Sequence, residues 1–312
     1  MKLLLTGATG AIGTPAVAQL VAAGHEVRGI ARDEHKASQL SAAGAEPVRA
    51  DVFDAAAVGR AVAGVDGILH LATNVPPMAK MALSSAWRTH NRLRTQATKL
   101  LIDAARAHDV SLFVKESITY TYPDCGDRWI DETVTPLEDV KLLRPALEGE
   151  RMVARFGADG GRGVVLRFGA FYGPTARGTD EALRVARMHV SPVPGDPEGY
   201  VSSIHVDDAA AAVVAVLDAP AGVYNCVDDE PLTRREYADA FAAAFDLPHL
   251  RIPPAGVMRA VGGSASRAIT ASQRVSNARL RGAADWAPAY PSVREGWASI
   301  AAARAHNEGA QR

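Results

Sequence analysis

Cysteine is scarce in this chain, which has only Cys125 and Cys226 among its 312 residues. The two lie about a hundred residues apart in the sequence, so they form no C-x-x-C pair and no disulfide framework. Neither cysteine has the spacing typical of a metal site. We therefore expect no bound metal and a reduced, cytoplasmic protein.

Long apolar runs and an excess of charge of one sign are also missing. No stretch of about 20 apolar residues could cross a bilayer. The opening MKLLLTGATG has three leucines before its first glycine, too few for the apolar core of a signal peptide. The net charge is −1, without a basic stripe. These absences argue against membrane and nucleic-acid partners.

Short apolar runs alternate with helix-length amphipathic stretches through the first two thirds of the chain. The pattern predicts helices over about 14–23 and 90–107, and strands over 2–6, 26–31, 47–51, 67–72, 111–117, 163–168 and 223–227. Strands separated by helices form right-handed βαβ units. The sequence therefore predicts the α/β class, with a Rossmann-type, doubly wound parallel sheet.

Proline, glycine and short helices are more frequent in the remaining segments. We expect residues 1–173 and 203–229 to form the dinucleotide-binding domain. Residues 174–202 and 230–312 are expected to form a smaller, interleaved region that binds substrate. No internal repeat or low-complexity linker separates the two.

A glycine-rich loop follows the first predicted strand, with the sequence TGATGAIG at residues 6–13. Gly7 permits a tight turn, Gly10 lets the backbone approach a pyrophosphate, and Gly13 lets the next helix pack closely on the sheet. The N-terminus of that helix offers free N–H groups to phosphates. Because the loop joins a strand to a helix, it predicts a dinucleotide site; the alternative is a tight turn without a ligand.

The end of the second predicted strand indicates which dinucleotide is bound. Proteins that bind NAD place Asp or Glu about 20 residues past the loop, to hold the ribose hydroxyls. Here Ala31 occupies that position and Arg32 follows it. An arginine can bind the 2′-phosphate of NADP(H), which a carboxylate would repel. NADP(H) is therefore the predicted cofactor, unless Asp33 and Glu34 neutralise Arg32 at the surface.

Several motifs together resemble the extended short-chain dehydrogenase/reductases, the NAD-dependent epimerase/dehydratase group. They are the glycine loop, DVFD at 51–54, HLATN at 70–74, the Asn91 helix, LRFGAFYGP at 166–174, SSIHVDDAA at 202–210 and SNARLRG at 276–282. The predicted cofactor contacts are Gly7, Thr9, Gly10, Ala11, Ile12, Gly13, Arg32, Asp51, Val52, Leu71, Ala72, Thr73, Phe168 and Gly169.

The catalytic residues that the resemblance implies are missing. Typical members use a Tyr with a Lys four residues later, and a Ser or Thr on the fifth strand that orients the substrate oxygen. None of the six lysines here follows a tyrosine by four residues. Alignment on the family places Leu142 at the tyrosine, Ala146 at the lysine and Ile118 at the serine. The usual proton transfer therefore cannot operate in this chain.

Hydride transfer remains feasible, since a ketone polarised by its own neighbouring phenol needs no protein tyrosine. The chain is similar to atypical ketoreductases of angucyclinone biosynthesis, such as that of the simocyclinone pathway. This resemblance implies NADPH-dependent reduction of an aromatic polyketide ketone. Ser117, Thr119 and Tyr120 would line the nicotinamide end, and apolar walls are expected from 74–83 and 253–268.

Two other functions stay open at this point. One is a sugar-nucleotide epimerase or dehydratase with relocated catalytic groups. The other is a regulator without catalysis that senses NADP(H) and binds a partner protein. The oligomeric state is also open, with a homodimer as one alternative, as are the identity of the substrate and the direction of the reaction.

Overall fold

The computed structural model describes residues 1–77, 80, 83–137, 140–262 and 265–310. Seven parallel strands form one sheet in the order β11-β7-β5-β4-β1-β2-β3. Their bounds are β1 (Lys2–Thr6), β2 (Glu26–Ala31), β3 (Glu46–Arg49), β4 (Gly67–His70), β5 (Leu112–Ile118), β7 (Arg162–Phe168) and β11 (Gly222–Cys226). The predicted doubly wound sheet is confirmed, and each predicted strand matches an observed one to within two residues.

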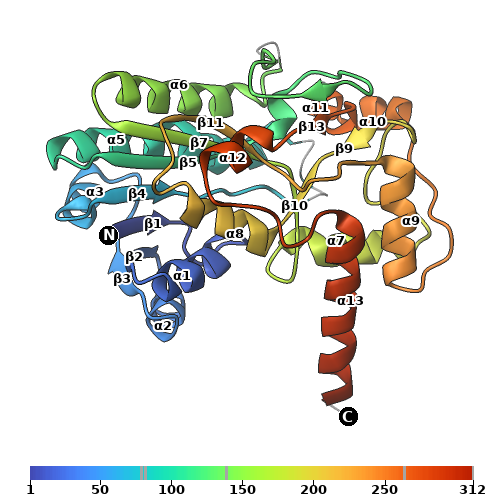
Figure 1. The fold of residues 1–312 in the computed structure, drawn as a ribbon, viewed down its shortest axis with the longest axis horizontal. Helices are drawn as coiled ribbons and strands as arrows, with labels where there is room; N and C mark the ends of the chain where they lie inside the picture. Colours follow the sequence, from blue (N-terminus) through green and yellow to red (C-terminus); the bar gives the residue numbers. More distant parts are fainter. Residues whose placement is uncertain (78–79, 81–82, 138–139, 263–264, 311–312) are drawn as a thin grey trace.

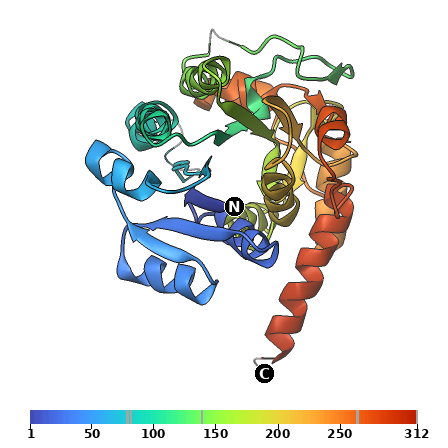
Figure 2. The same cartoon turned by 60° about the vertical axis from the view of Figure 1, so that its left-hand side comes forward.

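Helices cover both faces of this sheet (Figures 1 and 2). One face carries α1 (Gly13–Ala22), α2 (Glu34–Ala42) and α8 (Val206–Ala215). The other face carries α3 (Ala55–Val62), α5 (Thr98–Ala107) and α6 (Arg144–Ala158). The strand order reverses between β1 and β4, which is the point where open α/β sheets bind their ligands.

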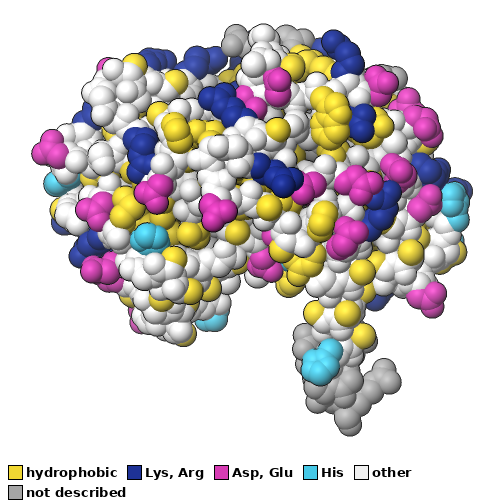
Figure 3. Space-filling model, viewed as in Figure 1, with side chains coloured by type: hydrophobic (Ala, Val, Ile, Leu, Met, Phe, Trp, Pro, Cys, Tyr) yellow, Lys and Arg dark blue, Asp and Glu magenta, His cyan; other side chains and the backbone are white. Residues whose placement is uncertain are grey.

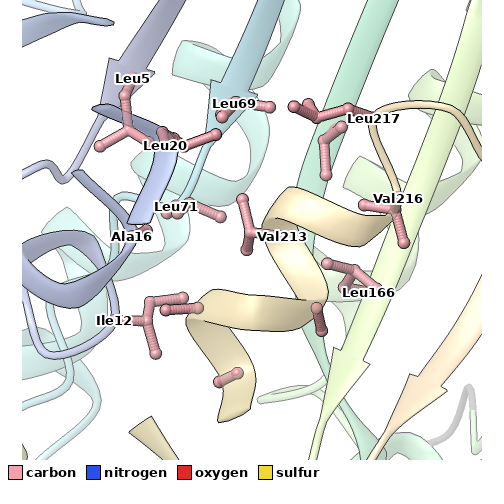
Figure 4. Packing of buried hydrophobic residues seen from close by; sticks show 14 of the residues in the cluster. Leu5, Ile12, Ala16, Leu20, Leu69, Leu71, Leu166, Val213, Val216 and Leu217 are labelled. Atoms are coloured by element: carbon pink, nitrogen blue, oxygen red, sulfur yellow. The ribbon is translucent and has the colours of Figure 1, made fainter. Parts of the chain in front are cut away.

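The larger core lies between the sheet and the α1–α8 layer. Leu5, Leu69 and Leu166, from three strands, meet Leu20 of α1 and Val213 of α8 there (Figure 4). These strands are covered on both faces, which explains why they read as continuous apolar runs. Fully burying each such side chain contributes about 1.5–3 kcal/mol, so this packing fixes the strand ends around the ligand-binding edge.

The predicted helix over 90–107 is observed in three parts. They are α4 (Arg88–Arg92), a π-helical segment η3 (Leu93–Ala97) and α5. The Thr98 hydroxyl donates to the carbonyl oxygens of Leu93 and Arg94, inside the π segment. Such hydroxyl bonds relieve backbone acceptors where the regular i→i−4 pattern is broken.

The remaining elements gather mostly at the right of Figure 1, beyond the carboxyl ends of the strands. They are η2 (Ser84–Trp87), η4 (Thr119–Thr121), β6 (Trp129–Ile130), β8 (Ala170–Tyr172), α7 (Arg177–Ala186), β9 (Tyr200–Val201), β10 (Ser203–His205), β12 (Leu232–Thr233), α9 (Arg234–Ala244), α10 (Ala255–Gly262), α11 (Ala265–Thr270), β13 (Arg274–Val275), α12 (Ala278–Ala283) and α13 (Val293–Ala310). Trp297 and Phe241 anchor a separate core here, at 4.7 Å between ring centroids. Leu280 and Trp286, by contrast, pack into the core of the sheet.

Acidic and basic side chains are interspersed over the face drawn in Figure 3. Helix α13 projects from the body toward the C-terminus (Figure 1). None of the helices that the structure describes is long and apolar enough to span a membrane.

Candidate functional site

The glycines of the loop after β1 lie very close to neighbouring backbone atoms. Gly7 has a φ of +75°, and a Cβ there would lie 2.8 Å from the backbone of Ala72 at the end of β4. A Cβ at Gly13 would lie 2.0 Å from the Gly7 carbonyl oxygen. Two of the three glycines are therefore required by sterics. The loop packs against the end of β4, at the switch point of the sheet.

Helix α1 begins directly after this loop. No side chain caps its N-terminus at Ile12. Uncapped N–H groups at a helix N-terminus form a site for an anion. The Thr175 hydroxyl donates to the Ala11 carbonyl oxygen at 2.7 Å, which ties the segment after β8 to the loop. Loop and helix together have the geometry that a dinucleotide pyrophosphate needs.

The end of β2 is followed by a cation, Arg32. Ala31 is buried and Arg32 is exposed, and Arg32 forms no ion pair with the part of the chain that the structure describes. Asp33 does not neutralise it, because its carboxylate caps α2 and pairs with Lys36 at 3.3 Å. Those contacts lower the pKa of Asp33, the backbone hydrogen bond from Lys36 most of all. Arg32 is thus free to meet a phosphate.

The other predicted cofactor residues lie at the ends of neighbouring strands. Asp51 follows β3, and its carboxylate accepts from the Phe53 amide. Leu71 is buried after β4, Ala72 is half-buried and Thr73 is exposed. Phe168 and Gly169 end β7 and are buried; Val52 is half-buried and Thr9 is half-buried within the glycine loop. All of these positions lie at the carboxyl edge of one sheet, and their contacts with a cofactor stay a prediction.

Ser117 of β5 belongs to a buried polar network. Its hydroxyl donates to Glu150 of α6 at 2.5 Å. Glu150 also accepts two bonds from Arg167 of β7, at 2.6 and 3.0 Å, and Arg167 donates to the Tyr122 hydroxyl at 2.8 Å. Tyr122 in turn donates to Asn225. The Ser117 hydroxyl is therefore already engaged inside the protein.

A second group of buried charges lies on β5 and η3. Arg94 of η3 donates to both carboxylate oxygens of Glu116, at 2.8 and 3.1 Å. Lys115 is almost fully buried and donates to the Glu116 carbonyl oxygen. Burial, with the nearby Arg94 charge, lowers the pKa of Lys115 to about 8. This lysine is on β5, and its amine packs against Gly149 of α6.

The positions aligned with the family's serine and tyrosine form an apolar cluster. Ile118 and Leu142 pack, with Tyr120, against Leu143 and Ala268. Ala146, at the position of the lysine, is buried in α6. Two of the positions that the alignment predicts for proton transfer thus lie in a largely apolar cluster, and their alignment with the family's catalytic residues stays a prediction.

A cleft of about 400 Å³ of empty space, partly open to solvent, adjoins this cluster through Tyr120. Its walls come from η4, β9 and the segments around α7, α9 and α11. The lining residues are Tyr120, Pro192, Val193, Pro194, Tyr200, Val201, Ser202, Arg234, Ile269, Ala271 and Gln273.

The three predicted catalytic residues differ in their relation to this cleft. Tyr120 lines it, and burial raises the pKa of its phenol while the charge of Arg234 opposes that rise. Thr119 is buried in η4, and Ser117 faces Glu150. The expected walls from 74–83 and 253–268 are not among the lining residues; Met78 and Met81 lie outside the described residues.

Sequence reasoning missed Arg234, which lines the cleft opposite the apolar residues. One signal was present. Arg234 follows Thr233 at the start of an amphipathic stretch, and a cation in the first turn of a helix is disfavoured by the helix dipole. A metal centre finds no support: in the ranges given above, no group of three or more His, Cys, Asp or Glu side chains could hold an ion.

Residues 3–226 match the NAD dependent epimerase/dehydratase family. The chain belongs to this family. A curated relative, 3-diazoavenalumate denitrifying reductase from Streptomyces sp, is 33% identical over 95% of this chain and 99% of its own.

Solved structures of the same fold carry either dinucleotide. Human epimerase family protein SDR39U1 with NADPH has a TM-score of 0.77 and 22% identity, covering 96% of this chain and 99% of that chain. Thermus thermophilus UDP-glucose 4-epimerase with NAD also has a TM-score of 0.77 and 22% identity, covering 96% and 98%. At these identities the likeness shows the fold alone.

Proposed function

We propose that the protein is an NADPH-dependent reductase of an aromatic ketone, and that the substrate itself supplies the polarisation and proton that a Tyr–Lys pair supplies in typical relatives. The observation that carries this proposal is a pair of facts at one sheet edge. Two of the loop's glycines are required by sterics, and Ile118 and Leu142, at the positions predicted for the proton-transfer groups, lie in an apolar cluster. The relative named as a reductase supports the reaction type.

The cofactor would lie along the carboxyl edge of β1 and β4, and when bound it would supply the hydride. The residues of this chain hold it in place. The α1 N-terminus would bind the pyrophosphate, and Arg32 would bind the 2′-phosphate. Gly7 and Gly13 allow the backbone approach that these contacts require.

The apolar cluster orients a flat substrate and keeps water away from the reacting carbon. Proximity and orientation alone can supply up to about 7–11 kcal/mol of the barrier in favourable intramolecular reactions. General acid catalysis adds about 10²–10⁴-fold, and an internal phenol beside the ketone can provide it. A hydroxyquinone or a related polyketide of antibiotic biosynthesis has this arrangement.

The test is NADPH oxidation with a panel of aromatic ketones, each with and without a neighbouring phenol. We expect turnover with the phenolic members only. An absence of turnover with every quinone-type ketone contradicts the proposal. Tight binding of a nucleotide sugar would favour an epimerase, and NADPH binding without any turnover would favour a sensor.

Cofactor choice has a separate test in Arg32→Ala. Loss of one hydrogen-bonded ion pair of about 1.5–3 kcal/mol raises the Kd for NADPH about 10–100-fold. The Kd for NADH should stay nearly unchanged, which makes NADH the internal control. Equal effects on both cofactors contradict a contact between Arg32 and the 2′-phosphate.

A further inference from the structure

Arg234 is an unusual residue to find among the mostly uncharged residues that line the cleft. Its side chain is only 1% exposed, yet it lines the cavity beside Tyr120 and Gln273. It is the one charged residue among the lining residues named above, and none of them is acidic. As the first residue of α9, its charge also meets the positive end of the helix dipole.

The hydrogen bonds of Arg234 leave part of the guanidinium unpaired. Nε donates to the Pro194 carbonyl oxygen at 2.7 Å, and Nη2 donates to those of Ala271 and Ile269 at 2.7 and 3.3 Å. Nη1 is buried and has no partner among the described residues. No carboxylate in those residues forms an ion pair with this side chain.

Two carboxylates act on Arg234 from a distance, and both are engaged elsewhere. Asp124 accepts from the amides of Gly126 and Ser272, and Asp196 accepts from the amide of Glu198. Burial lowers the pKa of Arg234. A buried cation that has carbonyl partners but no counter-ion is costly to keep, and an anion placed in the cleft would compensate it.

We propose that the cleft binds the anionic oxygen group of the substrate, a carboxylate or an acidic phenolate, with Arg234 supplying the positive charge and Tyr120 a hydrogen bond. This inference rests on the proposed function, since it names the class of substrate for the same site. Among the described residues the Tyr120 hydroxyl has no hydrogen-bond partner, so it is available to donate. Pro192, Val193 and Ile269 would contact the hydrocarbon part of the ligand.

A structural role for Arg234 explains the three carbonyl bonds without any ligand, because they join the loops at 194 and 269–271. That role and the proposed one differ in a measurable way. A structural arginine affects the affinity for all ligands of the cleft alike, whereas an anion site discriminates between an acid and its neutral analogue. The experiment therefore compares matched ligands.

The probes are 2-naphthoate with methyl 2-naphthoate, and 4-nitrophenolate at pH 8.5 with 4-nitroanisole, titrated calorimetrically with NADP⁺ present. A hydrogen bond to a charged group predicts that the anion binds about 10–100-fold more tightly than its neutral partner. Preference in the first pair alone assigns a carboxylate, and in the second pair alone a phenolate. Equal affinity within both pairs overturns the proposal.

Arg234→Gln should reduce the preference of the wild type to within about threefold, or less than 1 kcal/mol. Arg235→Gln is the matched control, because Arg235 carries the same charge one residue away and pairs with Asp239 outside the cleft. The control should keep the full preference. An Arg234→Gln protein that still binds NADPH and still prefers the anions overturns the proposal.

A second pair of variants applies if Arg234→Gln does not fold. Ile269→Glu places a carboxylate on the cleft wall, where it would pair with Arg234 and repel an anionic ligand. Ile269→Gln has the same shape without the charge. We expect the Glu variant to bind 2-naphthoate at least about tenfold more weakly than the Gln variant, with equal binding of the ester. Equal binding of the acid by both variants contradicts the anion site.

The two proposals can fail separately. Anion preference without turnover of any ketone leaves the anion site standing and removes the reductase. Ketone turnover without anion preference in either probe pair removes the anion site and leaves the reductase.

Discussion

The glycine-loop region and the β5–α6 region lie at the same edge of the sheet. They differ in whether their polar groups have partners inside the protein. In the glycine-loop region the polar groups are left unpaired: the α1 N-terminus has no side-chain cap, and Arg32 has no ion pair in the described chain. In the β5–α6 region the polar groups turn inward, and Ser117, Glu150 and Arg167 bond one another. Unpaired donors can meet a ligand, while a closed network stabilises the fold.

The largest loss of folding stability is expected when the closed network of Ser117, Glu150 and Arg167 is broken. Arg167→Leu leaves Glu150 buried without its partner, and breaking a buried pair on one side costs about 3–5 kcal/mol. Urea unfolding measures the loss. The control is Asp103→Asn, which removes the exposed ion pair with Lys99 and should change stability by less than about 1 kcal/mol. Similar costs at both sites would erase the contrast between the two regions.

A substitution in the glycine loop is expected to weaken NADPH binding. A Cβ at Gly13 would lie 2.0 Å from the Gly7 carbonyl oxygen, so Gly13→Ala forces the loop apart. Strain of about 1–3 kcal/mol corresponds to roughly 5–150-fold weaker NADPH binding. Gly282→Ala serves as control, because a Cβ there meets nothing within 4 Å. Unchanged NADPH fluorescence titration of Gly13→Ala would contradict a loop built for the pyrophosphate.

His70 of β4 lies between β1 and η3, and its burial predicts a smaller, pH-dependent effect. Its Nε2 donates to the Leu93 carbonyl oxygen, so Nδ1 accepts from the Thr6 hydroxyl of β1. Burial, with the Lys115 charge, lowers the pKa of His70 to about 3. The ring is therefore neutral in the folded protein. In the unfolded chain it binds a proton below about pH 6.5.

Stability should accordingly fall as the pH drops through 6.5. Between pH 7 and pH 5 the His70 ring alone lowers the free energy of unfolding by about 2 kcal/mol. His70→Gln should remove that part of the pH dependence, whatever its effect at pH 7, while replacing the exposed His108 by Gln should not. Urea unfolding at pH 7, 6 and 5 gives the slopes. Identical slopes for wild type and His70→Gln would show that the ring binds protons equally in the folded and unfolded states, which contradicts a ring kept neutral by burial.

The sequence predicted the part of the molecule whose signals are local. Strand 2–6 is observed at the same residues, and Gly7 and Gly13 of the next loop occupy positions that no side chain could share. Both are properties of short segments with a strong pattern.

The rest depends on contacts between distant segments. Arg234 joins carbonyl oxygens at 194, 269 and 271, and no periodicity relates those positions. The Ser117–Glu150 bond crosses 33 residues of sequence, so the inward direction of that hydroxyl was not readable from a strand alone. The expected walls at 74–83 and 253–268 were inferred from composition, which gives no contact between distant segments, and they stay a prediction.

Tyr120→Phe tests the central claim, that the cofactor edge works without a proton-transfer group from the protein. Of the three predicted catalytic hydroxyls, the one on Tyr120 lines the cleft. The measurement is kcat for NADPH oxidation with a hydroxy-substituted aromatic ketone and with its O-methyl ether, for wild type and variant. We predict that the variant keeps at least about a hundredth of the wild-type kcat, and that methylation of the substrate costs about 10²–10⁴-fold in both proteins. A loss beyond about 10⁴-fold in the variant, with no effect of methylation on the wild type, would show that Tyr120 is the acid and would contradict the account.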